Sequence, residues 1–371
     1  MSQRRRSIIL TVATLALLAL PAVAQEPIQQ SLDPSRALAH WTEARLAAAK
    51  PFALESGDAR PPGAAPAERG LQVSQSWAAS PPRRTIPAGL ATRLYHPAPA
   101  GGDAGPEPAL DTRDQGGGKA PFSSSQLVPL DADFFYPYAA VGKLFFEIPG
   151  VGPRFCSAAV IARRLIVTAA QCIHSGTPFP GFFTDLVFAP AYRDGEAFGF
   201  WPATSATLPT SWVNGGGVLP HPNDFAVIEL DEILVDGSFE RIGDLLGWLG
   251  WRTNALKKNH VHMLGYPENL DGGEVMHQVT AQIKKHTLAT NTSTAGSDMR
   301  GGAGGGPWIQ NFGFRSVGQQ VPGGDGSFNQ VVGVSSFFKL PSSQKLVGSS
   351  MLNATFVAVF NVACDNQPGN C

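Results

Sequence analysis

Three short segments of the chain contain residue types that could do chemistry. Residues 167–172 read Val-Thr-Ala-Ala-Gln-Cys, Asp224 stands directly before the apolar run Phe225-Ala226-Val227-Ile228, and residues 301–306 are nearly all glycine. A carboxylate at the start of a buried strand can orient a neighbouring polar group, and a glycine-rich turn can present backbone N–H groups to a developing anion. The glycine run lacks the Lys-Ser or Lys-Thr ending of a phosphate-binding loop, so we do not expect it to hold a nucleotide.

The elements that must position these segments are short strands. From about residue 126, apolar runs alternate with turns rich in Gly, Pro, Asn and Asp, and no strand–helix alternation typical of a parallel sheet is present. This pattern predicts a sandwich or a barrel, with one brief helical turn near residues 242–249. The expected strands are 140–148, 157–162, 165–168, 225–230, 260–264, 276–284, 306–310 and 330–338.

The three segments, in this order, resemble the signatures of the trypsin-like, chymotrypsin-fold serine peptidases. Those signatures are a Thr-Ala-Ala-His-Cys segment, a strand that begins Asp-Ile-Ala or Asp-Phe-Ala, and a Gly-x-Ser-Gly-Gly-Pro loop. Gly265-Tyr266-Pro267 is similar to the bacterial glutamyl-endopeptidase branch, and the whole resemblance covers residues 137–338. It implies an all-β fold of two antiparallel six-stranded β-barrels with few short helices.

The chain departs from the family at two catalytic positions. The resemblance puts Gln171 where the family has its histidine and Gly304 where it has its nucleophilic serine, and only Asp224 matches the catalytic aspartate. A glutamine amide does not titrate near neutral pH and cannot be a general base. Glycine has no side chain to form an acyl-enzyme. We therefore expect an inactive homologue, a pseudoprotease.

Parts of the binding apparatus could survive these changes. The resemblance implies that the backbone N–H groups of Gly302 and Gly304 form the oxyanion hole, which needs no side chain. Asp298, six residues before Gly304, matches a position near the floor of the primary specificity pocket, although it could equally cap a turn. Ser335 and Ser336 lie in a strand that resembles the family's substrate-pairing edge. We expect a peptide or protein ligand that docks there by strand addition.

Two other functions stay open. The first is an active serine-type endopeptidase with non-standard catalytic groups, in which His174 could replace the base; its nucleophile is missing, since the nearest serine before Gly304 is Ser297. The second is a structural surface protein with no ligand in the cleft between the barrels. His260 and His262 alternate on one strand face without a third ligand, so we expect neither a metal nor a cofactor.

Composition and charge exclude other classes of partner. The chain has 371 residues, with 28 Lys and Arg against 29 Asp and Glu, for a formal net charge of -1. It therefore lacks the basic field that binds nucleic acid. We expect a monomer. The 41 glycines and 31 prolines suit turn-rich β structure and irregular segments rather than helical bundles.

The first residues predict export. Three arginines at positions 4–6 precede an apolar run from 8 to 20, and Ala22-Val23-Ala24 forms a signal-peptidase pattern. Residues 1–24 are therefore expected to be a signal peptide, and whether it uses the general or the twin-arginine route stays open. No later stretch is long and apolar enough to span a bilayer. The expected location is secreted or periplasmic.

An exported protein with four cysteines is expected to form disulfides. Three pairings are possible, and proximity favours Cys156 with Cys172 and Cys364 with Cys371.

The chain divides into three parts on composition. After the signal peptide, residues 25–125 contain 14 of the 31 prolines and are expected to be a Pro/Gly-rich propeptide or linker, mostly disordered, with a short docking helix around residues 34–50. Residues 126–371 are expected to form the trypsin-like peptidase domain.

Overall fold

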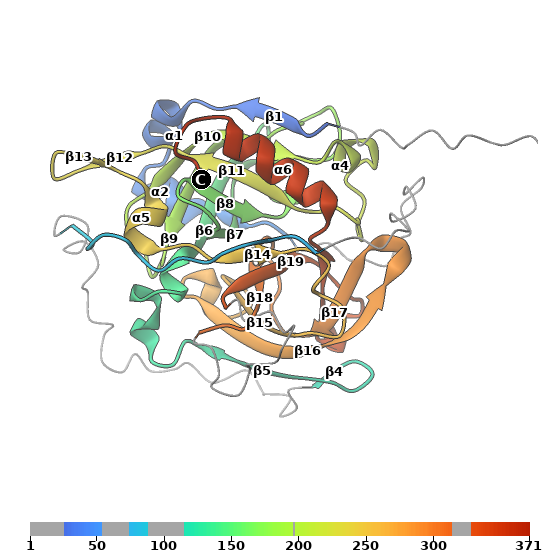
Figure 1. Ribbon diagram of the computed structural model, residues 1–371. Coiled ribbons are helices and arrows are strands. Elements are labelled where there is room, and N and C mark those ends of the chain that lie inside the picture. The colour runs from blue at the N-terminus through green and yellow to red at the C-terminus, as the bar shows by residue number, and fades with distance from the viewer. Residues whose placement is uncertain (1–25, 54–73, 88–114, 196, 314–327) are drawn as a thin grey trace, which may run out of the picture.

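The computed structural model describes residues 26–53, 74–87, 115–195, 197–313 and 328–371. The predicted signal peptide lies outside the described residues. Two β-barrels lie one above the other, as Figure 1 shows, with the C-terminal helix against the first barrel. No helix of the described residues combines the length and the apolar character needed to cross a bilayer.

The first barrel contains six antiparallel strands and closes through the pairing of β9 with β10. Its strands are short and almost entirely buried, which is why they appear in the sequence as apolar runs. In sheet order they are β6 (Val141–Ile148), β7 (Gly152–Val160), β8 (Leu165–Thr168), β11 (Ala226–Leu230), β10 (Trp201–Leu208) and β9 (Thr184–Pro190).

The second barrel also has six antiparallel strands and closes through the pairing of β15 with β16. The predicted all-β double barrel is therefore confirmed. In sheet order its strands are β15 (His260–Gly265), β18 (Pro307–Gln310), β19 (Gln330–Phe338), β20 (Leu346–Met351), β17 (Thr292–Gly296) and β16 (His277–Thr287).

The helices are short except for α6 (Ala354–Asp365). Asn353 caps α6 by accepting a hydrogen bond from the Phe356 backbone N–H at 3.2 Å, and its buried residues recur at helical spacing on the face that packs on β10 and β11. The other helices beyond residue 126 are α4 (Thr210–Asn214), α5 (Ile242–Leu246) and the 3-10 helices η1 (Leu130–Phe134), η2 (Tyr138–Ala140), η3 (Ala170–Cys172), η4 (Asp271–Gly273), η5 (Leu288–Thr290) and η6 (Ser342–Gln344).

Both predicted disulfides are present. Cys156 bonds to Cys172 and links β7 to η3, and Cys364 bonds to Cys371 at the end of α6. The first bridge lies in the buried core and holds the turn that carries Gln171 against β7.

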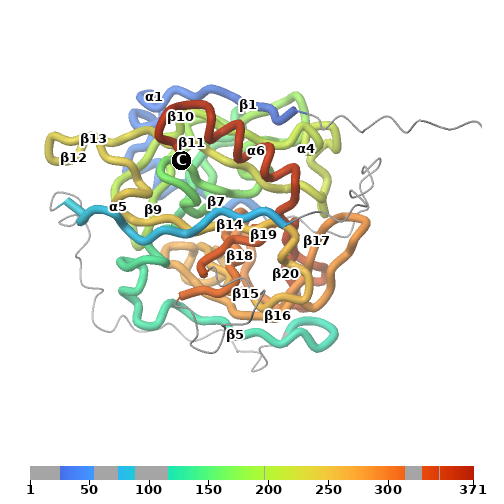
Figure 2. The backbone as a smooth tube through the Cα atoms, viewed as in Figure 1, coloured from blue at the N-terminus to red at the C-terminus, as the bar shows by residue number. Residues whose placement is uncertain are grey.

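Residues 26–53 are folded onto the first barrel, which corrects the disorder predicted for this part of residues 25–125. The strand β1 (Ile28–Ser31) adds to β10, and the strand β2 (Lys50–Pro51) adds to β7 in parallel. Between them lie the helices α1 (Pro34–His40) and α2 (Glu43–Ala48), in blue in Figure 2.

Two features of the sequence explain why residues 26–53 are folded. Asp33 caps α1, and Trp41 is buried against Phe145 with its indole Nε1 donating to the Asp185 carbonyl at 2.5 Å. Burial of one large aromatic side chain offsets part of the entropy of ordering this segment. Leu38, three residues before Trp41, is 46% exposed.

The rest of the predicted linker also contributes strands where it is described. The strand β5 (Ala120–Gln126) pairs with β16 and carries the short β4 (Gln115–Gly116), and β3 (Ser76–Trp77) pairs with β14 (Gly250–Arg252), which joins β19. The predicted boundary at residue 126 is therefore too late for the second barrel. Residues 54–73 and 88–114 lie outside the described residues.

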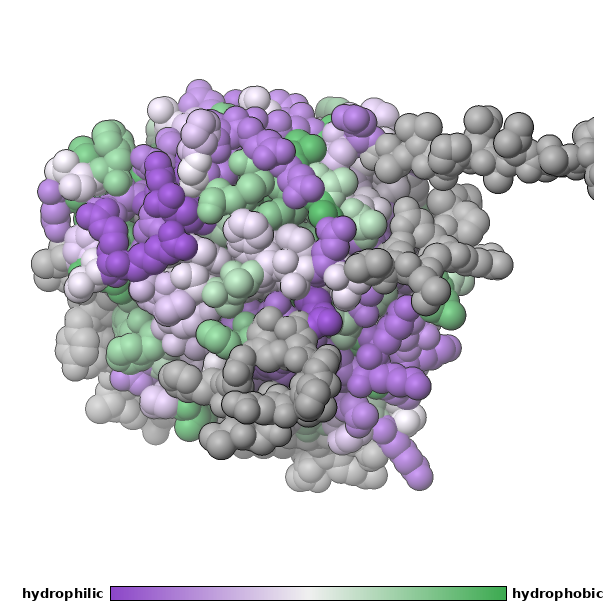
Figure 3. All heavy atoms as spheres, viewed as in Figure 1, coloured by the Kyte–Doolittle hydropathy of each residue, from purple (hydrophilic) through white to green (hydrophobic). Residues whose placement is uncertain are grey.

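One hairpin projects from the body of the protein. It consists of β12 (Ile233–Val235) and β13 (Ser238–Glu240), which pair only with each other among the described strands. Leu234 and Phe239 are 63% and 68% exposed, and Figure 3 shows apolar colour at this end of the molecule.

Candidate functional site

The fold brings the three chemical segments together where the barrels meet. Gln171 lies in η3 directly after β8, and Asp224 precedes β11, which pairs with β8 in a register that sets Ala226 opposite Thr168. Gly304 lies in the turn before β18 of the second barrel, and its carbonyl accepts a hydrogen bond from the Ser157 N–H of β7 at 2.8 Å. Sequence positions more than 130 residues apart thus share one junction.

Asp224 is fully buried and receives several hydrogen bonds. The Gln171 backbone N–H donates to its Oδ1 at 3.0 Å, while the Gln171 side-chain Nε2 donates to Oδ2 at 2.7 Å. The Ser336 hydroxyl donates to the same Oδ2 at 2.6 Å. Both carboxylate oxygens are therefore satisfied by groups that hold Gln171 and Ser336 in fixed positions.

Burial dominates the titration of this carboxyl group. Removal from water raises the pKa of Asp224 to about 6, against hydrogen bonds from Ser336 and Gln171 that lower it. The aspartate predicted from the sequence is thus a structural anchor whose proton affinity depends on the surrounding network.

The side-chain amide nitrogen of Gln171 donates to two buried acceptors. Besides Asp224, its Nε2 donates to the Ser336 carbonyl at 2.5 Å, and the side chain is 4% exposed. Its Oε1 is buried and has no hydrogen-bond partner among the described residues. An amide in this position can orient Asp224, but it can neither take up nor return a proton near neutral pH.

Gly304, which the resemblance places at the nucleophile position, differs in backbone conformation from Gly302 and Gly305. Gly302 and Gly305 have positive φ angles of 86° and 78°, whereas Gly304 does not. The backbone at position 304 therefore accepts an L-residue, and the glycine there is not required by the turn.

The hydroxyl groups nearest the site are committed elsewhere. The Ser336 hydroxyl donates to Asp224 and the residue has no exposed surface. The Ser157 hydroxyl donates to the Gly302 carbonyl at 2.9 Å and accepts from the Tyr266 N–H at 3.0 Å. Neither hydroxyl is accessible to a bound peptide.

The predicted oxyanion hole is not open. The Gly302 N–H donates to the Phe52 carbonyl at 3.0 Å, because residues 50–52 of the N-terminal segment lie along β7 at this point. The resemblance indicated Gly302 itself. Its partner could not be predicted from the sequence, because Phe52 lies in a segment whose composition is that of a linker.

The two serines of the predicted substrate-pairing strand have internal partners. The Ser335 hydroxyl accepts a hydrogen bond from Trp308 Nε1 at 2.9 Å, and the Ser336 carbonyl is bonded to Gln171. β19 pairs with both β18 and β20 at Gly333 and Val334, and from Ser335 to Phe338 it pairs with β20 alone among the described strands. The Ser335 hydroxyl and the Ser336 carbonyl thus have internal partners, and docking of a ligand along this strand stays a prediction.

Asp298 is tied to the outer strand of the second barrel. Its Oδ1 accepts a hydrogen bond from the Ser124 hydroxyl of β5 at 2.8 Å, and its carbonyl accepts one from Asn269. Arg300 lies near enough for this carboxylate to raise its pKa, although burial lowers that pKa by more. This arrangement favours the turn-anchoring role that the sequence left open.

The predicted histidines do not join the site. His174 accepts a hydrogen bond from the Gly176 N–H at 2.8 Å and packs edge-on against Phe182. His262 stacks on Phe312 with ring centroids 4.1 Å apart.

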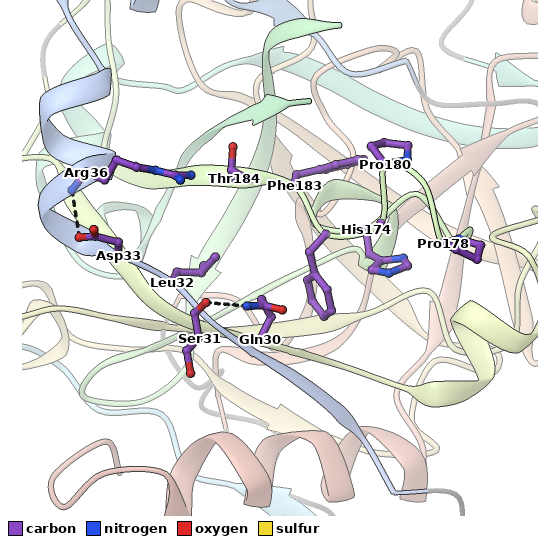
Figure 4. Close-up of a pocket in the computed structure, with 12 residues that line it drawn as sticks. Gln30, Ser31, Leu32, Asp33, Arg36, His174, Pro178, Pro180, Phe183 and Thr184 are labelled. Atoms are coloured by element: carbon purple, nitrogen blue, oxygen red, sulfur yellow. Dashed lines mark hydrogen bonds between the residues drawn. The ribbon is translucent and has the colours of Figure 1, made fainter. Parts of the chain in front are cut away.

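A pocket of about 570 Å³ lies elsewhere, between the N-terminal segment and the loop after η3. Figure 4 shows Asp33 and Arg36 of α1 on one side and His174 and Pro178 on the other. None of the predicted catalytic positions lines it, so it is separate from the junction of the barrels.

Comparisons with known proteins bear on the fold. No protein-family model matches the sequence, and no curated protein matches it. A structure of the protease Anisep from Arthrobacter nicotinovorans is similar with a TM-score of 0.50 and 23% identity, covering 61% of this chain and 95% of that one.

Two further structures are similar at slightly lower scores. A thermostable serine protease from an extremophilic microorganism has a TM-score of 0.49 and 22% identity, covering 62% of this chain and 98% of its own. A Glu endopeptidase has a TM-score of 0.48 and 19% identity, covering 67% and 97%. The match to Anisep confirms, at the level of fold, the resemblance that the sequence motifs indicated.

Proposed function

We propose that this chain, which has the double-barrel fold of the trypsin-like serine proteases, is a catalytically inactive homologue that binds an extended peptide or protein segment between its barrels. The proposal includes export to a secreted or periplasmic location, which fits the two disulfides and the predicted signal peptide. It also includes a monomeric state and no nucleic-acid partner.

The network around Asp224 is the observation that carries the inactivity. The carboxylate keeps its partners, but the group that it orients is the amide of Gln171, and position 304 offers no oxygen. Loss of the nucleophile in an enzyme of this mechanism lowers turnover by about 10⁶-fold.

Retention of the frame without the reactive groups favours a role in binding. Extended backbone already lies at the junction: the Phe52 N–H donates to the Phe155 carbonyl at 2.8 Å, and the Phe52 carbonyl accepts from Gly302. These two contacts use main-chain atoms alone, as strand addition does. The junction is therefore suited to peptide backbone of varied sequence.

The alternative of an active endopeptidase finds less support. It requires a hydroxyl or thiol that a substrate can reach, and Ser336, the hydroxyl bonded to Asp224, is fully buried. All four cysteines are in disulfides.

A peptide library panned against the full-length protein tests the binding role. Bound peptides are expected to protect backbone amides of β7 and of residues 301–306 from hydrogen exchange, because these strands and turns border the junction. Capture of peptides that protect only other surfaces would contradict the proposal. The proposal would also be contradicted if no peptide were captured either by the native chain or by a Phe52→Asp variant, in which residues 50–52 are expected to leave the junction.

A further inference from the structure

The last described residues of the N-terminal segment meet the junction through their backbone. Lys50 and Pro51 pair in parallel with Arg154 and Phe155 of β7. Phe52 then uses both of its main-chain groups, since its N–H donates to the Phe155 carbonyl at 2.8 Å and its carbonyl accepts from the Gly302 N–H at 3.0 Å. The Phe52 carbonyl therefore takes the donor that the sequence assigned to the oxyanion hole.

The side chains of this segment fit the surface beneath them. The Phe52 ring packs against Phe146 and Phe183, at centroid distances of 5.8 Å and 6.1 Å, and those two rings stack on each other at 5.2 Å. A Cβ added at Gly301 would lie 3.4 Å from the Pro51 side chain. The surface thus accommodates a proline followed by an aromatic residue.

The helices before this segment hold it in place. Arg36 of α1 bonds Asp185 of β9 through Nε at 2.8 Å, and the Trp41 indole donates to the Asp185 carbonyl. His40 lies 3.3 Å from the Glu147 carboxylate of β6. A ligand tethered in this way acts at an effective concentration of about 1 mM.

We propose that Lys50–Phe52 is an internal ligand that occupies the peptide site of the folded chain, and that an external peptide with a Pro-aromatic pair competes with it. This inference rests on the proposed function and specifies its ligand class and its control. The site binds extended backbone by the Phe155 carbonyl and the Gly302 N–H, and it selects the aromatic ring by the Phe146 and Phe183 rings.

Competition from the tethered segment sets the size of the effect. If a free peptide binds the empty site with a Kd of about 10 μM, then a competitor at an effective concentration of about 1 mM weakens its apparent affinity by about 100-fold. Removal of the internal ligand should restore that affinity.

The test compares the full-length native chain with its Phe52→Asp variant. The variant places a carboxylate against the Phe146 and Phe183 rings, so docking of residues 50–52 becomes unfavourable. The probe is a fluorescent peptide with the sequence of residues 47–53, Ala-Ala-Ala-Lys-Pro-Phe-Ala. Phe239→Asp makes the same change at a 68% exposed position of the β12–β13 hairpin and is the matched control.

Two readouts separate this inference from the proposed function. We expect amide exchange in the fragment that contains Gly302 to rise at least tenfold in Phe52→Asp and not in Phe239→Asp, and the peptide to bind Phe52→Asp at least tenfold more tightly than the native chain. The internal-ligand proposal would be overturned if amide exchange at Gly302 were the same in Phe52→Asp as in the native chain. It would also be overturned if the two proteins bound the peptide with equal affinity.

Library panning on the same folded variant distinguishes the remaining outcomes. If Phe52→Asp binds other peptides at the junction but not the 47–53 peptide, the internal-ligand proposal fails while the proposed binding function stands. If exchange at Gly302 rises but no peptide binds, the segment does cover the donor and the peptide-binding function fails. Circular dichroism and thermal unfolding verify that each variant is folded before either readout is taken.

Discussion

At the scale of single residues, Gln171 keeps the buried Asp224 carboxylate hydrogen-bonded. The amide nitrogen donates to Asp224 Oδ2 and to the Ser336 carbonyl, so the buried carboxylate keeps a partner on that side. Removal of that donor would leave a buried carboxylate under-satisfied, at a cost of about 1 to 3 kcal/mol. The Gln171 amide therefore keeps the Asp224 carboxylate hydrogen-bonded, and an intact network around Asp224 is not by itself evidence of catalysis.

The raised pKa of Asp224 predicts a specific pH dependence of stability. Burial raises this pKa to about 6 from the ordinary 3.8, so the native state holds a proton more tightly than the unfolded chain. The resulting stability is fully present below pH about 4 and is lost as pH rises through about 6, by about 3 kcal/mol in all.

Asp224→Asn removes this titration and is the comparison to make. Between pH 4 and pH 7, urea unfolding should show the native chain losing about 3 kcal/mol of unfolding free energy relative to Asp224→Asn. Burial also raises the pKa of Asp133 to about 6, and this titration affects both proteins alike. The quantity to compare is therefore the difference in unfolding free energy between the native chain and Asp224→Asn. A difference that does not vary with pH, or that varies with the opposite sign, would contradict the raised pKa.

The sequence indicated the positions of the site residues because each lies in a short local motif. The motifs could not indicate which distant residues form hydrogen bonds with these site residues. The partner of the Gly302 N–H is Phe52, 250 residues earlier in the chain. No local pattern specifies such a contact, because it depends on how α1 and α2 dock.

At the scale of elements, Trp41 is the largest buried side chain of the N-terminal segment. Trp41 is 9% exposed and packs on Phe145, whereas most of α1 and α2 faces solvent. Truncation of a buried Trp costs about 3 to 5 kcal/mol. The segment should therefore detach when Trp41 is replaced, while the barrels remain folded.

Limited proteolysis checks this prediction. Trp41→Ala should make residues 26–53 at least tenfold more sensitive to a broad-specificity protease, with little change in the barrel fragments. Leu38→Ala, at a 46% exposed position of α1, is the control and should change stability by about 0.5 kcal/mol or less. Equal sensitivity of the two variants would show that Trp41 does not anchor the segment.

Strand prediction found several continuous apolar runs, but it missed the apolar strand β9 and the strands made of small and polar residues. The runs at β6, β8, β11 and β19 were found with bounds within about one residue. In contrast, β17 reads Thr-Ser-Thr-Ala-Gly and β20 reads Leu-Val-Gly-Ser-Ser-Met, which resemble turns. Their buried hydroxyls have partners only in the folded state, as when Ser350 donates to the His221 carbonyl.

At the scale of the whole molecule, an ion pair between a buried lysine and a partly exposed glutamate connects the barrels. Lys143 of β6 in the first barrel is 1% exposed, and its Nζ lies 2.9 Å from Oε1 of Glu274, just after η4 of the second. The ammonium also lies over the rings of Phe155 and Tyr192, at 4.1 Å and 4.4 Å. Burial lowers the pKa of Lys143, and Glu274 opposes that effect.

A double-mutant cycle measures what this pair contributes. Glu274→Gln should destabilise the protein by about 1 to 3 kcal/mol, because it leaves a buried ammonium without its carboxylate, although Glu274 is itself partly exposed. Adding Lys143→Met should recover most of that loss, since no buried charge then remains. Additive losses in urea unfolding would mean that the two side chains do not act as a pair.

The proposed function holds that this chain keeps the fold of a serine protease but lacks its reactive groups. Its most direct test measures casein cleavage and labelling by a serine-directed fluorophosphonate for the native chain and for Gln171→His combined with Gly304→Ser. The backbone conformation at position 304 suits an L-residue because its φ is not positive. Adding Phe52→Asp frees the Gly302 N–H.

We expect the native chain to show neither reaction, the double variant to label at the introduced serine, and the triple variant to label faster. The proposed inactivity would be contradicted if the native chain cleaved casein or became labelled. Loss of that reaction in Ser336→Ala would identify Ser336 as the nucleophile.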